Sequence, residues 1–240
     1  MKIWIAGLSL AACLHSVAGE TAATPVLVEL FTSEGCSDCP PADRLLEQLD
    51  QAQPVAGAQI IVLSEHVDYW DRLGWRDPFS SHVFSERQEE YARRLRVESP
   101  YTPQMVVDGE TEFVGSDGRR AVAAIRMAAR NPKARVRIAR VLGGAVRVEV
   151  DPLPGYSGGV YLAVVQKSGV SQVLRGENGG RSLHHVAIVR RMEALGKFNG
   201  RIGFAKEVPA IEAGEGAFRV IAFVQDGDNG PVRGAAVLSR

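Results

Sequence analysis

The sequence predicts an α/β domain followed by an all-β, sandwich-like domain. Up to residue 132, continuous apolar runs typical of buried strands alternate with segments of helical periodicity. From residue 133 onward, short alternating runs separated by Gly, Asn and Asp replace the helical pattern. A chain of 240 residues can hold one large domain or two modest ones. We therefore expect domains at residues 24–132 and 133–240.

The first predicted strand is the apolar and β-branched run at residues 25–32 (PVLVELFT), which is typical of a strand buried on both faces. Apolar residues then recur at i, i+3, i+4 and i+7, which predicts an amphipathic helix with Ala42, Leu45, Leu46 and Leu49 on its inner face. Residues 60–64 (IIVLS) predict a second buried strand, and residues 79–97 a second helix.

A pair of strands and a last helix complete the first region. Residues 104–108 predict a third strand that ends in a turn at Asp108-Gly109, and residues 112–115 predict its partner. Residues 118–130 predict a helix that stops before Pro132. The order β-α-β-α-β-β-α indicates an α/β domain with an antiparallel edge.

The second region contains only strand-like patterns. Val146, Val148 and Val150 alternate with charged residues, and Gly143-Gly144 before them is typical of a hairpin. Further strand-like runs cover residues 159–166, 184–191, 201–206, 217–225 and 232–238. Short strands with frequent turns predict a β-sandwich.

The charge balance does not favour a nucleic-acid partner. The 28 basic residues balance the 28 acidic ones, so the formal net charge is +0. No basic doublet extends into a longer basic run, as a nucleic-acid or anionic membrane surface would require. We therefore predict no nucleic-acid binding.

The first 19 residues predict a secretory signal peptide. A basic Met1-Lys2 start is followed by a mostly apolar stretch and by the small residues Ser16-Val17-Ala18. The stretch is shorter than the roughly 20 residues of a membrane span, so we expect a periplasmic or secreted bacterial protein without an integral span. Residues 10–13 (LAAC) also fit a lipobox, which leaves open a lipid anchor at Cys13.

The cysteines that remain after removal of the signal peptide, Cys36 and Cys39, form a C-x-x-C motif. Such a pair closes only a small loop, so we expect a chemical rather than a structural role. The motif lies where a strand meets a helix N-terminus, whose free N–H groups and dipole stabilise a thiolate, although the charge of Asp38 opposes this. We expect Cys36 to attack as the exposed thiolate and Cys39 to resolve the mixed disulfide.

Two other interpretations of the motif are weaker alternatives. It could be half of a zinc site, but the chain has no second C-x-x-C and its histidines lack zinc-finger spacing, so we predict no metal site. It could also be an inert structural disulfide.

Several segments resemble a known family. Residues 26–43 (VLVELFTSEGCSDCPPAD), 65–75 (EHVDYWDRLGW), 102–104 (TPQ) and 175–178 (RGEN) are similar to the secreted bacterial family called domain of unknown function 1223, whose members are thioredoxin-like. The resemblance covers nearly all of the mature chain. It implies a thioredoxin-like fold and an extracytoplasmic location, but no substrate.

The wider resemblance to thioredoxins implies further site residues. Thr102-Pro103 resembles the cis-proline beside the active cysteines of that fold, where Thr102 would present its backbone to an extended substrate; a trans proline opening a strand is the alternative. Glu29 lies near the position of the buried acid that accepts a proton from the deeper cysteine, although the loop here is one residue longer. An ion-paired or exposed Glu29 is the alternative.

The segment after the second strand supplies a second group of candidates. In α/β sheets, ligands bind beyond the carboxyl ends of the strands, where His66, Tyr69 and Trp70 lie in this sequence. His66 could supply positive charge or a proton, and the two aromatic residues could form an apolar lip for a peptide or small ligand. The alternative is a loop that only seals the core. His184 and His185, on opposite sides of a strand, are predicted to be structural.

These features favour an extracytoplasmic thiol–disulfide oxidoreductase that acts on a protein or small thiol or disulfide partner. No cofactor is expected besides the Cys36–Cys39 disulfide. One alternative is a copper-delivery protein that binds Cu(I) through both sulfurs and His66. Another is a secreted interaction module without catalysis.

Overall fold

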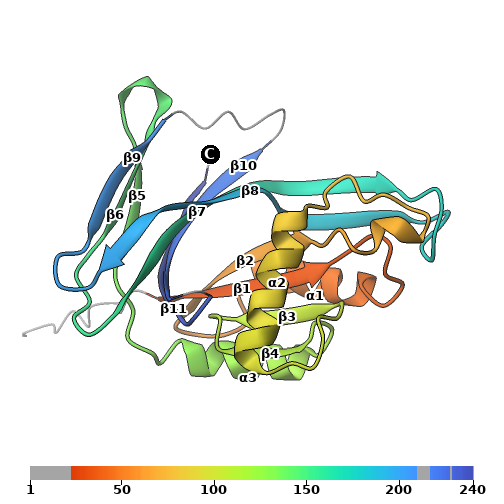
Figure 1. The fold of residues 1–240 in the computed structure, drawn as a ribbon, viewed down its shortest axis with the longest axis horizontal. Helices are drawn as coiled ribbons and strands as arrows, with labels where there is room; N and C mark the ends of the chain where they lie inside the picture. Colours follow the sequence, from red (N-terminus) through yellow and green to blue (C-terminus); the bar gives the residue numbers. More distant parts are fainter. Residues whose placement is uncertain (1–22, 210–216, 228, 240) are drawn as a thin grey trace, which may run out of the picture.

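The computed structural model describes residues 23–209, 217–227 and 229–239 (Figure 1). The expected signal peptide and the lipid anchor at Cys13 lie outside these residues. Within the described part of the chain, no helix has the length and apolar character needed to cross a membrane.

The first half of the chain follows the predicted order β-α-β-α-β-β-α. Its elements are β1 (Thr24–Thr32), α1 (Pro40–Ala52), β2 (Ala58–His66), the short 3-10 helix η1 (Asp71–Leu73), α2 (His82–Leu95), β3 (Gln104–Val107), β4 (Thr111–Val114) and α3 (Gly118–Ala128). β1 is the centre of this half: it pairs in parallel with β2 and antiparallel with β3, and β3 pairs antiparallel with β4.

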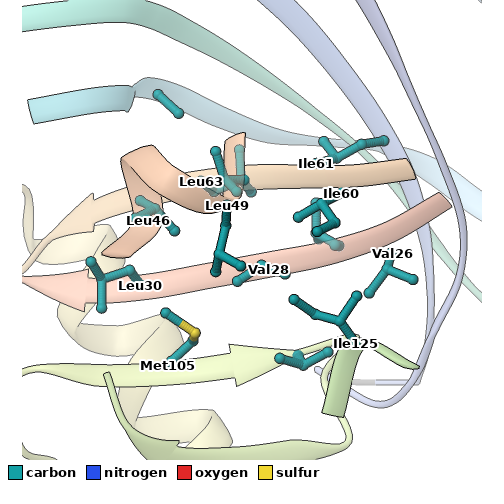
Figure 2. Close-up of a cluster of buried hydrophobic side chains, with 14 of the residues drawn as sticks. Val26, Val28, Leu30, Leu46, Leu49, Ile60, Ile61, Leu63, Met105 and Ile125 are labelled. Carbon is teal, nitrogen blue, oxygen red and sulfur yellow. The ribbon is translucent and has the colours of Figure 1, made fainter. Parts of the chain in front are cut away.

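Alternation along β1 decides which helix each side chain contacts. Val28 and Leu30 point into the main core with Leu46 and Leu49 of α1, as Figure 2 shows. Burial of each such side chain contributes roughly 1.5–3 kcal/mol. The intervening residue Glu29 points toward α2, on the other face of the sheet. The central strand is therefore buried on both faces, as its composition predicts.

In the second half, the described residues form seven strands. They are β5 (Val136–Arg140), β6 (Val146–Val150), β7 (Ser157–Gln172), β8 (Ser182–Asn199), β9 (Phe204–Val208), β10 (Phe218–Asp226) and β11 (Val232–Ser239), with a short 3-10 turn η2 (Leu142–Gly144) between β5 and β6. β7 and β8, with 16 and 18 residues, are much longer than the apolar runs that predicted them. The ladder continues through glycine and polar residues outside those runs, such as Gly158, Ser168 and Gly169, which interrupt the apolar pattern.

The two halves share one sheet, which differs from the expected arrangement. The eight-stranded sheet has the order β11-β10-β7-β8-β2-β1-β3-β4, and only β5, β6 and β9 form a sheet of their own. Ser64 of β2 and Ile188 of β8 mark the parallel junction between the halves. Residue 132 therefore does not separate two sheets, because periodicity predicts where strands occur but not which strands pair.

The long strands also join two cores. Ala163 and Val165 of β7 belong to the main core, whereas Leu162 and Val164 face the second core beneath β5 and β6. The β7–β8 hairpin extends across the molecule, and its turn reaches the end of the sheet where α1 begins (Figure 1). This turn contacts the cysteine loop through Asn178.

Candidate functional site

The C-x-x-C motif lies between the end of β1 and the start of α1. Cys36 and Cys39 are joined by a disulfide, with their Cα atoms 5.4 Å apart. Cys39 is the N-cap of α1, and the first helical positions are Pro40 and Pro41. Proline is tolerated there because the first N–H groups of a helix have no partner within the helix.

The sheet brings two other predicted segments to this loop. Thr32 at the end of β1 lies opposite His66 at the end of β2, and Phe31 lies opposite Gln104 at the start of β3. The segment after β2 and the segment before β3 therefore meet at the cysteine loop. The Thr102–Pro103 peptide bond is cis, as the resemblance implied.

Trp70 connects these segments. Its indole Nε1 donates a hydrogen bond to Thr102 Oγ1 at 2.8 Å. A Cβ placed on Gly35 would lie only 3.0 Å from the Trp70 Cβ, so the residue before Cys36 packs closely against this side chain. Tyr69 lies differently: its hydroxyl donates to Gln88 Oε1 of α2 at 3.1 Å, and burial raises its pKa to about 12. The side chain of Thr102 also interacts with the Tyr69 hydroxyl, so both aromatic residues lie against the segment before Pro103.

The turn between β7 and β8, residues 173–181, is hydrogen-bonded to the backbone of the cysteine loop; we call it the covering turn. Asn178 Nδ2 donates to the carbonyl oxygens of Glu34 and Cys36, both at 2.9 Å. The backbone N–H of Ser37 donates to Glu177 Oε2 at 3.0 Å, across 140 residues of sequence.

The burial of both cysteines corrects one expectation about them. Cys36 is 2% exposed and Cys39 is 0% exposed, so Cys36 is not the open, accessible sulfur that the motif predicted. The Cys39 N–H is not one of the free N–H groups that the motif predicted at the helix start, because it donates to the Cys36 carbonyl oxygen at 3.2 Å. Access to the disulfide therefore depends on segments that are remote in the sequence.

His66 is fully buried beneath the loop. Its Nδ1 lies 2.7 Å from Asp77 Oδ2, and its ring packs against Phe79 and His185. Burial raises the pKa of Asp77, but the charge of His66 and hydrogen bonds from His66 and two backbone amides outweigh this and hold it below its usual value. In the described ranges, no group of three or more His, Cys, Asp or Glu side chains is arranged to hold a metal ion.

Glu29 is ion-paired, which was the alternative to its role as a proton acceptor for Cys39. The Arg87 guanidinium donates to Glu29 Oε1 at 2.6 Å, and the Tyr91 hydroxyl donates to Oε2 at 2.6 Å. Both partners belong to α2. The proton transfer between Glu29 and Cys39 stays a prediction, and these contacts do not support it.

Three buried residues near the disulfide did not emerge from the sequence. Asp43 lies one helical turn after Cys39: its N–H donates to the Cys39 carbonyl oxygen at 3.1 Å. His185 Nδ1 lies 3.7 Å from Asp43 Oδ2, and His185 Nε2 lies 3.3 Å from Glu34 Oε1. Burial lowers the pKa of His185, but the two carboxylates outweigh it and raise the pKa to about 10. His185 is therefore cationic at neutral pH.

Only part of this arrangement has a local signal in the sequence. The i, i+4 spacing of Cys39 and Asp43 places both on one face of α1. His185 lies in a predicted strand, where a single histidine was expected to be structural. The residue pattern of neither segment indicates that β8 contacts α1. The structure places His185 between the two carboxylates.

The chain belongs to a known family. The family described as "Protein of unknown function (DUF1223)" matches residues 27–225, a range that includes the cysteines, the cis-proline and the covering turn. This confirms the family resemblance of the sequence segments.

A solved structure is similar over nearly the whole length. The X-ray structure of a structural-genomics protein from Agrobacterium tumefaciens has a TM-score of 0.75 and 26% sequence identity, and the match covers 91% of this chain and 96% of that chain. Both halves of the present chain therefore lie within the shared fold, a mixed α/β architecture with a large sheet. No curated protein matches the chain.

Proposed function

We propose that this protein is an extracytoplasmic thiol–disulfide oxidoreductase with a thioredoxin-like first half and Cys36–Cys39 as its redox-active disulfide. The observation that carries the proposal is a disulfide-bonded C-x-x-C at the join of a central strand and a helix, at the end of the sheet that also holds the cis Thr102–Pro103 bond. The order β2-β1-β3-β4, with β3 antiparallel to β1, supports the thioredoxin-like assignment.

The exchange proceeds through a mixed disulfide. In the oxidising direction, a partner thiolate attacks Cys36 Sγ, the Cys36–Cys39 bond breaks, and Cys39 leaves as a thiolate with the electron pair. A second partner thiolate attacks the partner sulfur of the mixed disulfide and releases the Cys36 thiolate. One protein disulfide and two partner thiols thus become a protein dithiol and a partner disulfide, and the reverse sequence reduces a partner disulfide.

The surrounding residues have distinct roles in this proposal. The backbone of Thr102, before the cis Pro103, binds an extended partner segment. Trp70, hydrogen-bonded to Thr102, forms an apolar wall beside it. The covering turn moves away before the attack, because Cys36 is 2% exposed in the closed structure. An extracytoplasmic location suits a protein whose resting state is a disulfide.

Trapping tests the proposal directly. A Cys39→Ala variant lacks the resolving sulfur, so it should accumulate mixed disulfides at Cys36 that appear on non-reducing gels and disappear with reductant. The Cys36→Ala/Cys39→Ala double variant is the matched control and should give no adducts. The wild type, but not Cys36→Ser, should also reduce insulin with dithiothreitol as electron donor. Absence of both adducts and insulin reduction would overturn the proposed function.

A further inference from the structure

Two buried carboxylates flank the disulfide, one on each side in the sequence. Glu34 precedes Cys36 by two residues and is 0% exposed, and Asp43 follows Cys39 by four residues and is 6% exposed. Glu34 Oε2 accepts a hydrogen bond from Trp75 Nε1 at 2.7 Å, and Asp43 Oδ1 accepts one from Thr32 Oγ1 at 2.9 Å. Neutral donors alone do not compensate two buried negative charges.

His185 supplies the positive charge between them. Its Nε2 lies 3.3 Å from Glu34 Oε1 and its Nδ1 lies 3.7 Å from Asp43 Oδ2, both within ion-pair distance, and the residue is 1% exposed. The other titratable group that packs against its ring is His66, at a centroid distance of 4.7 Å, which is in turn paired with Asp77. His185 is thus held by the cysteine loop, by α1 and by the end of β2.

We propose that His185 is a positioning residue for the thiol–disulfide exchange: between Glu34 and Asp43, its imidazolium offsets the two carboxylates and stabilises the Cys39 thiolate that forms when the disulfide opens. This inference rests on the proposed function and adds the group that sets the stability of the Cys39 thiolate. His185 itself forms and breaks no covalent bond.

The need for such a group follows from the leaving sulfur. When a partner thiolate attacks Cys36, Cys39 takes the electron pair of the broken bond and becomes an anion in a buried position. The carboxylate of Asp43, one helical turn away, disfavours that anion, whereas the cation paired with Asp43 offsets this charge. Stabilising the thiolate favours the dithiol form and makes the protein a stronger oxidant.

The test is the redox equilibrium of the purified protein with reduced and oxidised glutathione at pH 7, read by mass after alkylation. His185→Gln removes the cation, so we expect the equilibrium to shift at least tenfold toward the disulfide, or about 30 mV at this two-electron couple. Asp43→Asn removes one carboxylate and should shift it in the opposite direction, toward the dithiol. His184→Gln is the control, because its exposed ring is paired with Glu47 at 3.6 Å; its equilibrium should stay within twofold of the wild type.

The directions in which His185→Gln and Asp43→Asn shift the redox equilibrium distinguish the proposed electrostatic role of His185 from a purely structural one. A purely structural His185 would give no shift, or would give shifts in the same direction for both variants, and either result overturns the inference. If His185→Gln does not fold, Asp43→Asn and Glu34→Gln decide, because both must move the equilibrium toward the dithiol. A wild-type disulfide that does not exchange with glutathione at all contradicts the proposed function instead, so the two failures are distinguishable.

Discussion

At the scale of single residues, Glu65 is a buried acid beside an ion pair that is already balanced. It lies on β2 with 0% exposure, and its Oε2 is 3.7 Å from Arg87 Nε. Arg87 is engaged by Glu29, so a second carboxylate charge at this place would be uncompensated. Burial, and next the negative charge of Glu29, raise the pKa of Glu65 well above its usual value. The structure therefore favours Glu65 in its neutral form.

We predict that Glu65→Gln stabilises the protein at alkaline pH. Because the pKa of Glu65 is raised on folding, the stability it contributes is complete below about pH 4.5 and is lost as the pH rises through the folded-state pKa. Glutamine does not ionise, so the variant should match the wild type near pH 5 and exceed it at pH 8, as measured by urea unfolding. Glu86→Gln, an exposed change on α2, serves as control. A variant less stable than the wild type at pH 8 would contradict the prediction.

The Glu29–Arg87 pair gives a second prediction at this scale. Arg87→Met leaves the Glu29 carboxylate buried without its cation, while the Tyr91 hydroxyl still donates to it. Breaking a buried pair from one side costs about 3–5 kcal/mol, which urea unfolding at pH 7 should detect. Arg93→Met is the matched control, because its exposed pair with Glu89 spans 3.9 Å and contributes less than about 0.5 kcal/mol. Equal losses in both variants would refute the role assigned to the buried pair.

At the scale of elements, local patterns predicted the first half well. The apolar spacing of Ala42, Leu46 and Leu49 corresponds to α1, and the positions of the cysteines and of the cis-proline in the site followed from motif and resemblance. The long extensions of β7 and β8 and their turn were missed. A glycine-rich turn contains no local indication of a partner 142 residues earlier, so its hydrogen bond to Cys36 was not predictable.

The covering turn leads to a prediction about access. Asn178→Ala removes both hydrogen bonds that Asn178 donates to the carbonyl oxygens of Glu34 and Cys36. Losing these bonds should favour local opening by about 1–2 kcal/mol, so the disulfide should react about tenfold faster with dithiothreitol under native conditions. The rate of disulfide reduction is measured by quenching samples at successive times, alkylating the free thiols and determining the mass of the protein. Arg175→Ala, an exposed change on the same turn, should leave it unchanged, and an unaltered rate in Asn178→Ala would show that the turn does not limit access.

At the scale of the whole molecule, one sheet joins the two halves of the chain. β2 pairs with β1 on one side and with β8 on the other. The main core contains Val62 and Leu63 of β2 together with Ala187 and Val189 of β8 and Phe223 of β10. Tertiary packing, and not strand propensity, sets this parallel, long-range pairing. Periodicity reports only the local pattern, which changes at residue 132, and it therefore suggested a domain boundary there.

The shared sheet predicts that the first half does not fold alone. A fragment of residues 23–132 would expose the β2 edge and the part of the main core that Ala187, Val189 and Phe223 cover. Unfolding in urea, followed by the fluorescence of Trp70 and Trp75, should be cooperative for residues 23–240 and gradual or absent for the fragment. A fragment that unfolds cooperatively, with a free energy within about 1 kcal/mol of the full chain, would instead establish residue 132 as a domain boundary. The second half would then be an addition to an independent domain, and the covering turn a contact between domains.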